Sequence, residues 1–235
     1  MSRESLSCPG SEPFMEKIRD LTASFFELTR FEVEGLNNLE LMRDGEPVII
    51  AFFPHSGHPD SLAVRRAFPQ ELRKKLIYPA AADYWHNGIK GKARSVLSSM
   101  AVNSFPVSRD DHLKGIESGL KSAIRYLEEG FSIVISPEGT RSSLPLSERN
   151  LRTGMAELIL RTGRPVIPVR LRGLEDAMPK GSNFSFNSLV RDNKGQRLIS
   201  VTFGKPIDFD LGGETLRSRQ RKIIMAQLKQ QFLQM

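Results

Sequence analysis

The 235-residue sequence predicts an α/β fold: a single domain with a largely parallel central sheet flanked by helices, plus an N-terminal amphipathic helix. Two observations carry this prediction. Short apolar runs rich in β-branched residues alternate along the chain with stretches of helical periodicity, which is the pattern of a sheet whose strands are joined by helices. Several of these runs lead directly into polar turns, as strands of an open α/β sheet do at the edge where ligands bind. The sequence contains no internal repeat, low-complexity tract or interdomain linker.

The first thirty residues are expected to form a lead and an amphipathic helix that precede the main domain in the chain. Residues 1–12 have no periodic pattern and are expected to lack regular structure. Apolar residues then recur at helical spacing, opposite a charged face: Phe14, Ile18, Leu21, Phe25 and Leu28. The charges of this helix nearly cancel, so packing on the domain core is favoured over a position on a membrane surface. We therefore divide the chain into residues 1–30, the lead and amphipathic helix, and residues 31–235, the α/β domain.

Periodicity and turn residues place the remaining elements. The expected strands cover residues 31–35, 48–53, 76–78, 103–109, 131–135 and 165–171, and the expected helices cover residues 61–68, 92–100, 113–127, 153–161 and 220–232. Pro69 and Gly130 end two of these helices. Residues 184–190 and 197–203, joined by the turn Asp192-Asn-Lys-Gly195, are predicted to pair as a β-hairpin.

The composition is basic, with a formal charge of +7 and an isoelectric point near 9.7. Such a balance favours anionic partners: phospholipid surfaces, nucleotide-bearing cofactors, phosphorylated substrates or nucleic acid. Cys8 is the only cysteine, which excludes a disulfide framework and a cysteine-based metal site. The sequence shows no signal peptide and no apolar stretch of about 20 residues. We therefore expect a cytoplasmic protein that is peripherally associated with the membrane.

The turn from His55 to Asp60 carries the clearest catalytic signal. It follows an apolar run that ends at Pro54, and Asp60 opens the next helical pattern. A tight strand-to-helix turn can bring the imidazole and the carboxylate together. A carboxylate that accepts from one ring nitrogen leaves the other nitrogen free to take a proton, which is the minimum equipment of a general base. The turn offers no nucleophile of its own, which suggests that the attacking hydroxyl belongs to the substrate.

Two further polar turns follow predicted strands, at residues 105–109 and 138–142, and such loops gather on one edge of an open α/β sheet. In the second turn a glycine, two hydroxyls and a guanidinium stand together. Gly139 permits close backbone approach and Arg141 can make a bidentate contact, as recognition of a phosphate requires. Each turn taken alone is more often an ordinary polar loop.

Taken together, four ordered blocks resemble the glycerol-phosphate and lysophospholipid acyltransferase family. The blocks are His55-x4-Asp60, Phe105-Pro-Val-Ser-Arg109, Ser136-Pro-Glu-Gly-Thr-Arg-Ser142 and Val166-Ile-Pro-Val169. The likeness extends from about Phe31 to Ile207, most of the chain. A His-x4-Asp pair alone recurs by chance, whereas the Pro-Glu-Gly-Thr-Arg-Ser string is specific to this family, and the order and spacing of all four blocks agree with it.

The resemblance implies a role for each matching residue and makes residues 31–235 an acyltransferase domain. The catalytic pair falls on His55 and Asp60. The positions associated with binding the acceptor's glycerol-phosphate portion are Arg109, Glu138, Gly139, Thr140 and Arg141. Pro168 is linked to structure or to the acyl-donor side.

The chain also departs from the family pattern in three places. Pro54 stands where an asparagine is common, the second block lacks its usual glycine, and Ala80-Ala-Ala-Asp-Tyr-Trp replaces a lysine-containing segment. These features look like a subgroup sometimes found beside acyl-activating, adenylate-forming enzymes. They leave the acceptor and the acyl donor open.

The implied reaction is an O-acyl transfer without a covalent acyl-enzyme. His55 removes the proton from an acceptor hydroxyl as it attacks a thioester carbonyl, while Asp60 orients the imidazole; such base catalysis contributes roughly 10²–10⁴-fold. No Gly-x-Ser-x-Gly elbow is present, and Cys8 has no sequence context as a nucleophile. The resemblance implies a fatty acyl donor on coenzyme A or acyl carrier protein, a co-substrate rather than a permanently bound cofactor. It implies a lysophospholipid acceptor, with conversion of lysophosphatidate to phosphatidate as the default.

Other functions stay open from the residues alone. His55, His58 and Asp60 are a plausible metal-ligand set, although His86 and His112 stand outside any ligand motif. A protein that holds acyl chains or carriers without turnover is a second alternative, and nucleic-acid binding would rest on net charge alone. We expect neither a metal nor nucleic acid, and we do expect an anionic membrane surface as a partner. The basic candidates for that surface are Arg65, Arg66, Arg73, Lys74 and Lys75.

Overall fold

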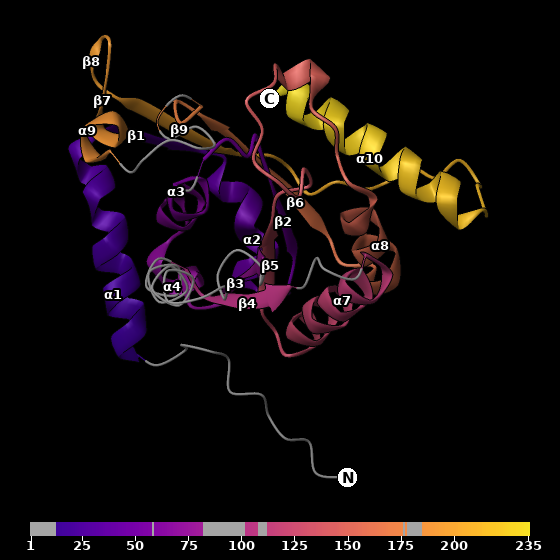
Figure 1. The fold of residues 1–235 in the computed structure, drawn as a ribbon. Coiled ribbons are helices and arrows are strands. Elements are labelled where there is room, and N and C mark those ends of the chain that lie inside the picture. Colours follow the sequence, from indigo (N-terminus) through magenta and orange to yellow (C-terminus); the bar gives the residue numbers. More distant parts are fainter. Residues whose placement is uncertain (1–12, 58, 82–101, 108–111, 176, 178–184) are drawn as a thin grey trace.

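The computed structural model describes residues 13–57, 59–81, 102–107, 112–175, 177 and 185–235. Over these residues the main sheet has seven strands in the order β1-β9-β6-β2-β5-β3-β4 (Figure 1). The strands are β1 Arg30–Glu34, β2 Ile49–Phe53, β3 Leu76–Ala81, β4 Ser104–Val107, β5 Ser132–Ile135, β6 Val166–Arg172 and β9 Leu198–Phe203. Neighbouring strands are parallel except β6 and β9, which are antiparallel. The predicted α/β domain with a largely parallel sheet is confirmed.

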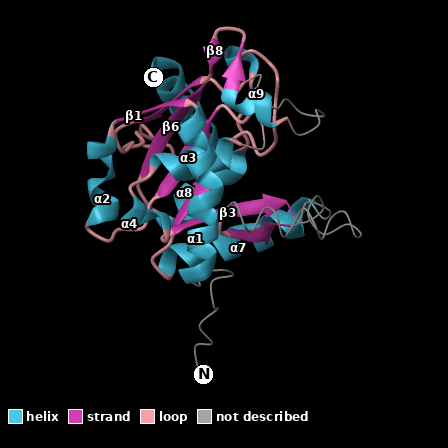
Figure 2. Cartoon of the chain, turned by 90° about the vertical axis from the view of Figure 1, so that its left-hand side faces the viewer, coloured by secondary structure: helices cyan, strands magenta, loops and turns pink. Residues whose placement is uncertain are grey.

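Helices cover both faces of this sheet (Figure 1). Helices α1 Pro13–Ala23 and α3 Asp60–Ala67 lie on one side, where α3 contacts β6 and β9. Helices α7 His112–Glu128, α8 Thr153–Thr162 and α10 Arg217–Gln234 lie on the other side. Figure 2 turns the first side toward the viewer, with α1 and α3 in front. The short elements are η1 Ser24–Leu28, η2 Leu36–Leu39, α2 Glu40–Arg43, α4 Gln70–Arg73, η3 Leu146–Glu148, α9 Phe186–Val190, β7 Arg191–Asp192 and β8 Gly195–Gln196.

Strand β2 is central and buried along its whole length. Ile50 and Phe52 pack in the core beneath α3, whereas Ile49 and Phe53 pack in the core beneath α7, α8 and α10. The Phe53 ring stacks on Phe232 of α10 with centroids 5.0 Å apart. Burial on both faces explains why β2 reads as a continuous apolar run rather than as an alternating one. It also means that the turn after β2 is presented by a rigid strand.

The predicted hairpin between residues 184–190 and 197–203 is wrong. The first segment forms α9, which Ser185 caps because its hydroxyl accepts from the Ser188 N–H at 3.3 Å. Strand β9 instead joins the main sheet between β1 and β6. Only the tip of the predicted hairpin exists, as the small ribbon of β7 and β8. An apolar run this short cannot be assigned to strand or helix by periodicity alone.

The amphipathic helix is present as α1, and its last turn continues as η1. Its acidic residues face the domain: Glu16 and Asp20 accept from Arg65 of α3 at 2.7 and 3.0 Å. Arg65 is fully buried, and Arg73, which also donates to Asp20, is nearly so. The helix therefore packs on the domain through ion pairs. The expectation that Arg65 and Arg73 belong to a membrane-facing basic surface is wrong, because α1 covers and neutralises them.

The other elements lie close to their expected positions, with α3, α7, α8 and α10 at the predicted helices. Strand β3 runs further than predicted, to Ala81, and α4 adds a helical turn that periodicity did not indicate. The lead at residues 1–12 and the expected helix at residues 92–100 lie outside the described residues. In the described part of the chain, no helix combines the length and apolar character needed to cross a bilayer.

Candidate active site

Strand β2 delivers the predicted catalytic turn to the edge of the sheet. His55 lies just beyond the end of β2, and Asp60 is the first residue of α3. The His55 Nδ1 atom lies 3.0 Å from Asp60 Oδ2. The Asp60 side chain is 1% exposed, whereas the His55 side chain is 22% exposed. The fold thus brings the two residues together and leaves part of the imidazole open to solvent.

Three donors converge on one oxygen of Asp60. Beside His55 Nδ1, the Ser56 and Gly57 N–H groups donate to Oδ2 at 2.6 and 2.8 Å. These two backbone donors fix the position of the Asp60 carboxyl group. Asp60 can then accept only from a protonated Nδ1, so the other ring nitrogen, Nε2, is the one available to take a proton.

The Glu-Gly-Thr-Arg turn, here called the Glu138 turn, follows β5, the neighbour of β2, and meets the turn from His55 to Asp60 through Glu138. Glu138 Oε2 accepts from the His55 N–H at 2.5 Å, and Oε1 accepts from Arg149 at 3.3 Å. Burial raises the pKa of the Glu138 carboxyl, although the His55 N–H and Arg149 act in the opposite direction. The Ser142 N–H donates to the His55 carbonyl at 2.9 Å. The Glu138 turn therefore forms hydrogen bonds with both the N–H and the carbonyl group of His55.

Arg149 is a part of the site that the sequence did not indicate. It lies in the loop after η3 and is 3% exposed. One of its terminal nitrogens donates to Ser56 Oγ at 3.2 Å, inside the turn from His55 to Asp60. An arginine in a polar loop has neither a motif nor a periodicity to mark it, so only the fold reveals the contact.

The remaining predicted site residues divide into two groups. Gly139, Thr140 and Arg141 continue the Glu138 turn; Gly139 has a φ of +66°, Gly139 and Thr140 are exposed, and Arg141 is half-buried. Arg109 and the candidate metal ligand His58 lie outside the described residues. Within the described residues, no group of three or more metal-ligating side chains comes together.

A sequence profile described as Acyltransferase matches residues 30–172, from the start of β1 to the end of β6. The chain belongs to the acyltransferase family. The match includes His55, Asp60 and the whole Glu138 turn, so the site just described lies inside the family domain. No match was found among curated proteins.

The fold of this acyltransferase is similar to the crystal structure of the 1-acyl-sn-glycerophosphate (LPA) acyltransferase PlsC from Thermotoga maritima. The TM-score is 0.58 and the sequence identity is 18%, and the alignment covers 94% of this chain and 78% of the PlsC chain. At this low identity the comparison shows a shared fold.

An apolar cavity of about 220 Å³ lies next to the Glu138 turn of the acyltransferase. It is enclosed between β3, β4 and β5 on one side and α7 and α8 on the other. Gly139 and Arg152 contribute to its lining beside the site. Phe105, Ala123 and Leu158 are among the apolar residues that line the rest. Its lining is almost entirely apolar, as a site for a hydrocarbon chain requires.

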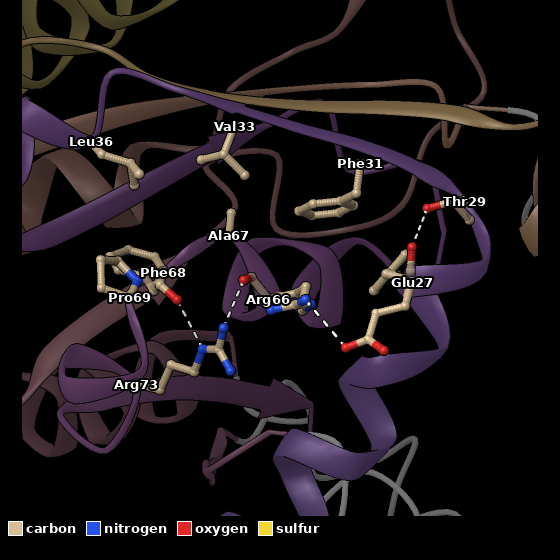
Figure 3. Close-up of a pocket in the computed structure, with 11 residues that line it drawn as sticks. Glu27, Thr29, Phe31, Val33, Leu36, Arg66, Ala67, Phe68, Pro69 and Arg73 are labelled. Atoms are coloured by element: carbon tan, nitrogen blue, oxygen red, sulfur yellow. Dashed lines mark hydrogen bonds and ion pairs between the residues drawn. The ribbon is translucent and has the colours of Figure 1, made fainter.

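A second, wider hollow of about 590 Å³ lies on the opposite face of the sheet (Figure 3). Phe31 and Val33 of β1 form one wall and Phe68, at the end of α3, forms part of the other. Arg66 reaches Glu27 across it at 3.5 Å. Neither His55 nor the Glu138 turn contributes to its lining. This hollow is therefore separate from the turn that carries His55 and Asp60.

Proposed function

We propose that this acyltransferase moves a fatty acyl group from a thioester donor to the hydroxyl of a lysophospholipid, with lysophosphatidate as the default acceptor. The His55–Asp60 contact of 3.0 Å carries the proposal, because it supplies a base and its orienting carboxylate. The nearest hydroxyl of the turn, Ser56, is buried and accepts from Arg149. This supports attack by the hydroxyl of the substrate rather than by the protein. The donor is acyl-coenzyme A or acyl-acyl carrier protein, acting as a co-substrate.

In the proposed reaction His55 Nε2 takes the proton from the acceptor hydroxyl as its oxygen attacks the thioester carbonyl carbon. The carbon–sulfur bond then breaks, and the proton passes from the imidazolium to the leaving thiolate. Asp60 stabilises the imidazolium between these steps. Base catalysis supplies roughly 10²–10⁴-fold of the rate, and the rest comes from positioning and from stabilising the oxyanion.

The decisive experiment is product analysis. The purified protein is offered a panel of acyl-coenzyme A and acyl carrier protein thioesters with lysophosphatidate, other lysophospholipids and monoacylglycerol, and the products are identified by mass spectrometry. Formation of phosphatidate is the expected result. A different acylated product would correct the acceptor, and thioester binding without any product would indicate a non-catalytic acyl-binding protein.

The acceptor phosphate is proposed to bind at Arg141. A charge-assisted hydrogen bond contributes about 1.5–3 kcal/mol, so Arg141→Ala should lower kcat/KM for lysophosphatidate by about tenfold or more. Arg141→Lys should restore only part of this loss, because a point charge cannot reproduce a bidentate contact. The loss should shrink sharply with monoacylglycerol, which lacks the phosphate. An equal loss with both acceptors would assign Arg141 to structure or to the acyl donor.

The cavity beside the site is proposed to take the acyl chain of the donor. Ala123 of α7 lines it and is 6% exposed, so Ala123→Phe should fill much of the space. We expect kcat/KM for a long-chain acyl thioester to fall by about tenfold or more, since burial of each methylene is worth about 0.8 kcal/mol. An acetyl thioester is the matched control, and its transfer by the same variant should be unchanged. Equal losses with both donors would show that the substitution disturbs the site itself.

Peripheral contact with a membrane is proposed to involve the outward side of α1 and η1. Phe14, Leu21 and Leu28 are 71%, 74% and 54% exposed. Phe14 and Leu21 are seven residues apart in α1 and so share one side of the helix, away from Glu16, which pairs with Arg65; Leu28 ends η1. Large apolar side chains on one helix face suit the interface between lipid headgroups and acyl chains. The family's lipid acceptors would be met at such a surface.

A further inference from the structure

The guanidinium of Arg149 contacts three groups around His55: the His55 carbonyl, the Ser56 hydroxyl and the Glu138 carboxylate. Its Nη1 donates to Glu138 Oε1 at 3.3 Å and to the His55 carbonyl at 3.4 Å. Its Nη2 donates to Ser56 Oγ at 3.2 Å. Glu138 in turn accepts from the His55 N–H through its other oxygen. One buried ion pair therefore holds the backbone of the histidine from both sides.

Arg149 is itself firmly held. Its Nε donates to the Leu144 carbonyl at 2.8 Å, and its guanidinium lies 6.0 Å from the ring centre of Phe53. Lys229 of α10 donates to the backbone carbonyls of Ser147 and Arg149 at 2.8 and 3.0 Å. Residue 149 thus contacts α10 through its backbone carbonyl, and its side chain joins the loop after the Glu138 turn to the turn from His55 to Asp60. Arg149 is buried and held in place, so its side chain is not available to bind a substrate at the surface.

Both members of this pair are 3% exposed. A buried ion pair often adds little net stability compared with apolar residues of similar size, but removing one partner leaves an uncompensated charge. In some proteins, buried polar or ionic groups specify a geometry rather than add stability. Here the geometry that they specify is that of the general base.

We infer that Arg149 is a positioning residue for catalysis and that, paired with Glu138, it fixes the turn from His55 to Asp60. This assignment rests on the proposed function of His55 as the base. It also gives Glu138 a role different from the one that the family resemblance implies. Its two carboxylate oxygens are occupied by His55 and Arg149, so it acts on the histidine backbone rather than on the acceptor.

Three variants test the inference: Arg149→Met, Arg149→Lys and the double variant Arg149→Met with Glu138→Gln. Because a misplacement of about 1 Å can cost roughly 10²-fold, Arg149→Met should lower kcat by about 100-fold while KM for both substrates changes less than about threefold. Arg149→Lys should recover part of kcat. The double variant should be no worse than Arg149→Met, because the two residues act as one unit.

The pH profile gives a second readout. Burial raises the pKa of Glu138, whereas the hydrogen bond from the His55 N–H, Arg149 and the His55 side chain lower it. Removing Arg149 raises this pKa further. Protonation of Glu138 weakens its charge-assisted bond to the His55 N–H, so activity on the acid side of the kcat profile should be lost at a higher pH in Arg149→Met. The limb should move less in Arg149→Lys, which keeps a charge.

Arg197 is the matched control. It is also buried, at 4% exposure, and donates to the backbone carbonyls of Ser188, Gly173 and Arg191, away from the catalytic turn. Arg197→Met should lower the unfolding temperature but leave the kcat and pH profile of the folded protein unchanged. If Arg149→Met behaves in the same way, its role is only structural and the inference is overturned.

Amide hydrogen exchange separates this inference from the proposed function, because it needs no substrate. In Arg149→Met the amides of His55, Ser56, Gly57 and Ser142 should exchange at least about tenfold faster, while those of β6 stay protected. Unchanged exchange in the turn would overturn the inference even if transfer activity falls. If the wild-type protein transfers no acyl group, the proposed function fails, and faster exchange would still show that Arg149 holds the turn.

Discussion

His55→Ala should lower acyl transfer by roughly 10³-fold, within the range that general-base catalysis supplies, while leaving the fold intact. The imidazole is partly exposed, and among the described residues its side-chain hydrogen-bond partner is Asp60. Asp60 keeps its two backbone donors, and the backbone contacts of residue 55 with Glu138 and Ser142 do not need the ring. The measurement is turnover of purified protein at saturating substrate, together with the unfolding temperature. Near-normal turnover in a well-folded variant would exclude His55 as the base.

Asp60→Asn accompanies this test. The amide oxygen can still accept from the Ser56 and Gly57 N–H groups, so the turn should keep its shape. A neutral side chain cannot stabilise the imidazolium, and it can leave the wrong ring nitrogen protonated. We therefore expect kcat to fall by roughly 10²-fold or more with little change in acceptor KM. A change in KM alone would assign Asp60 to binding rather than to catalysis.

The second large effect should appear in stability. Arg65→Met should lower the free energy of unfolding by about 3 kcal/mol, the lower end of the range for breaking a buried ion pair. The lower end applies because Glu16 and Asp20 are 19% and 26% exposed and can be partly hydrated. The variant also leaves the Arg73 carbonyl without its donor. Urea unfolding measures the loss, and limited proteolysis should show α1 released before the rest of the chain unfolds.

Arg66→Met is the control for this stability test. Arg66 is the next residue of α3, but its side chain is 32% exposed and its contact with Glu27 is 3.5 Å long. Exposed pairs of this kind are worth about 0–1 kcal/mol. If the two variants lose the same stability, apolar contacts rather than the ion pairs hold α1 on the domain.

The comparison of β2 with the 184–190 segment shows where sequence reasoning succeeds and where it stops. Strand β2 is bounded by turn residues, rich in β-branched and aromatic side chains, and followed by a helical pattern, so several local signals agree. The 184–190 segment offers only a short apolar run. It is helical in the structure because Ser185 caps α9 and because β9, its expected partner strand, pairs with β6 instead. Local signals that agree predict an element, whereas a single signal does not.

The sequence by itself determined the α/β class, the catalytic pair as a hypothesis and the order of the four blocks, because these depend on periodicity and on residues close together in the chain. Only the tertiary structure decided the rest. It set Glu138 against the His55 N–H across 83 sequence positions and Arg149 against Ser56 across 93. It also turned Arg65 and Arg73 from expected surface charges into buried partners of α1. Long-range pairing of charges depends on which strands are neighbours and which helices cover them. Local sequence patterns do not contain this information, so these pairs could not be predicted from them.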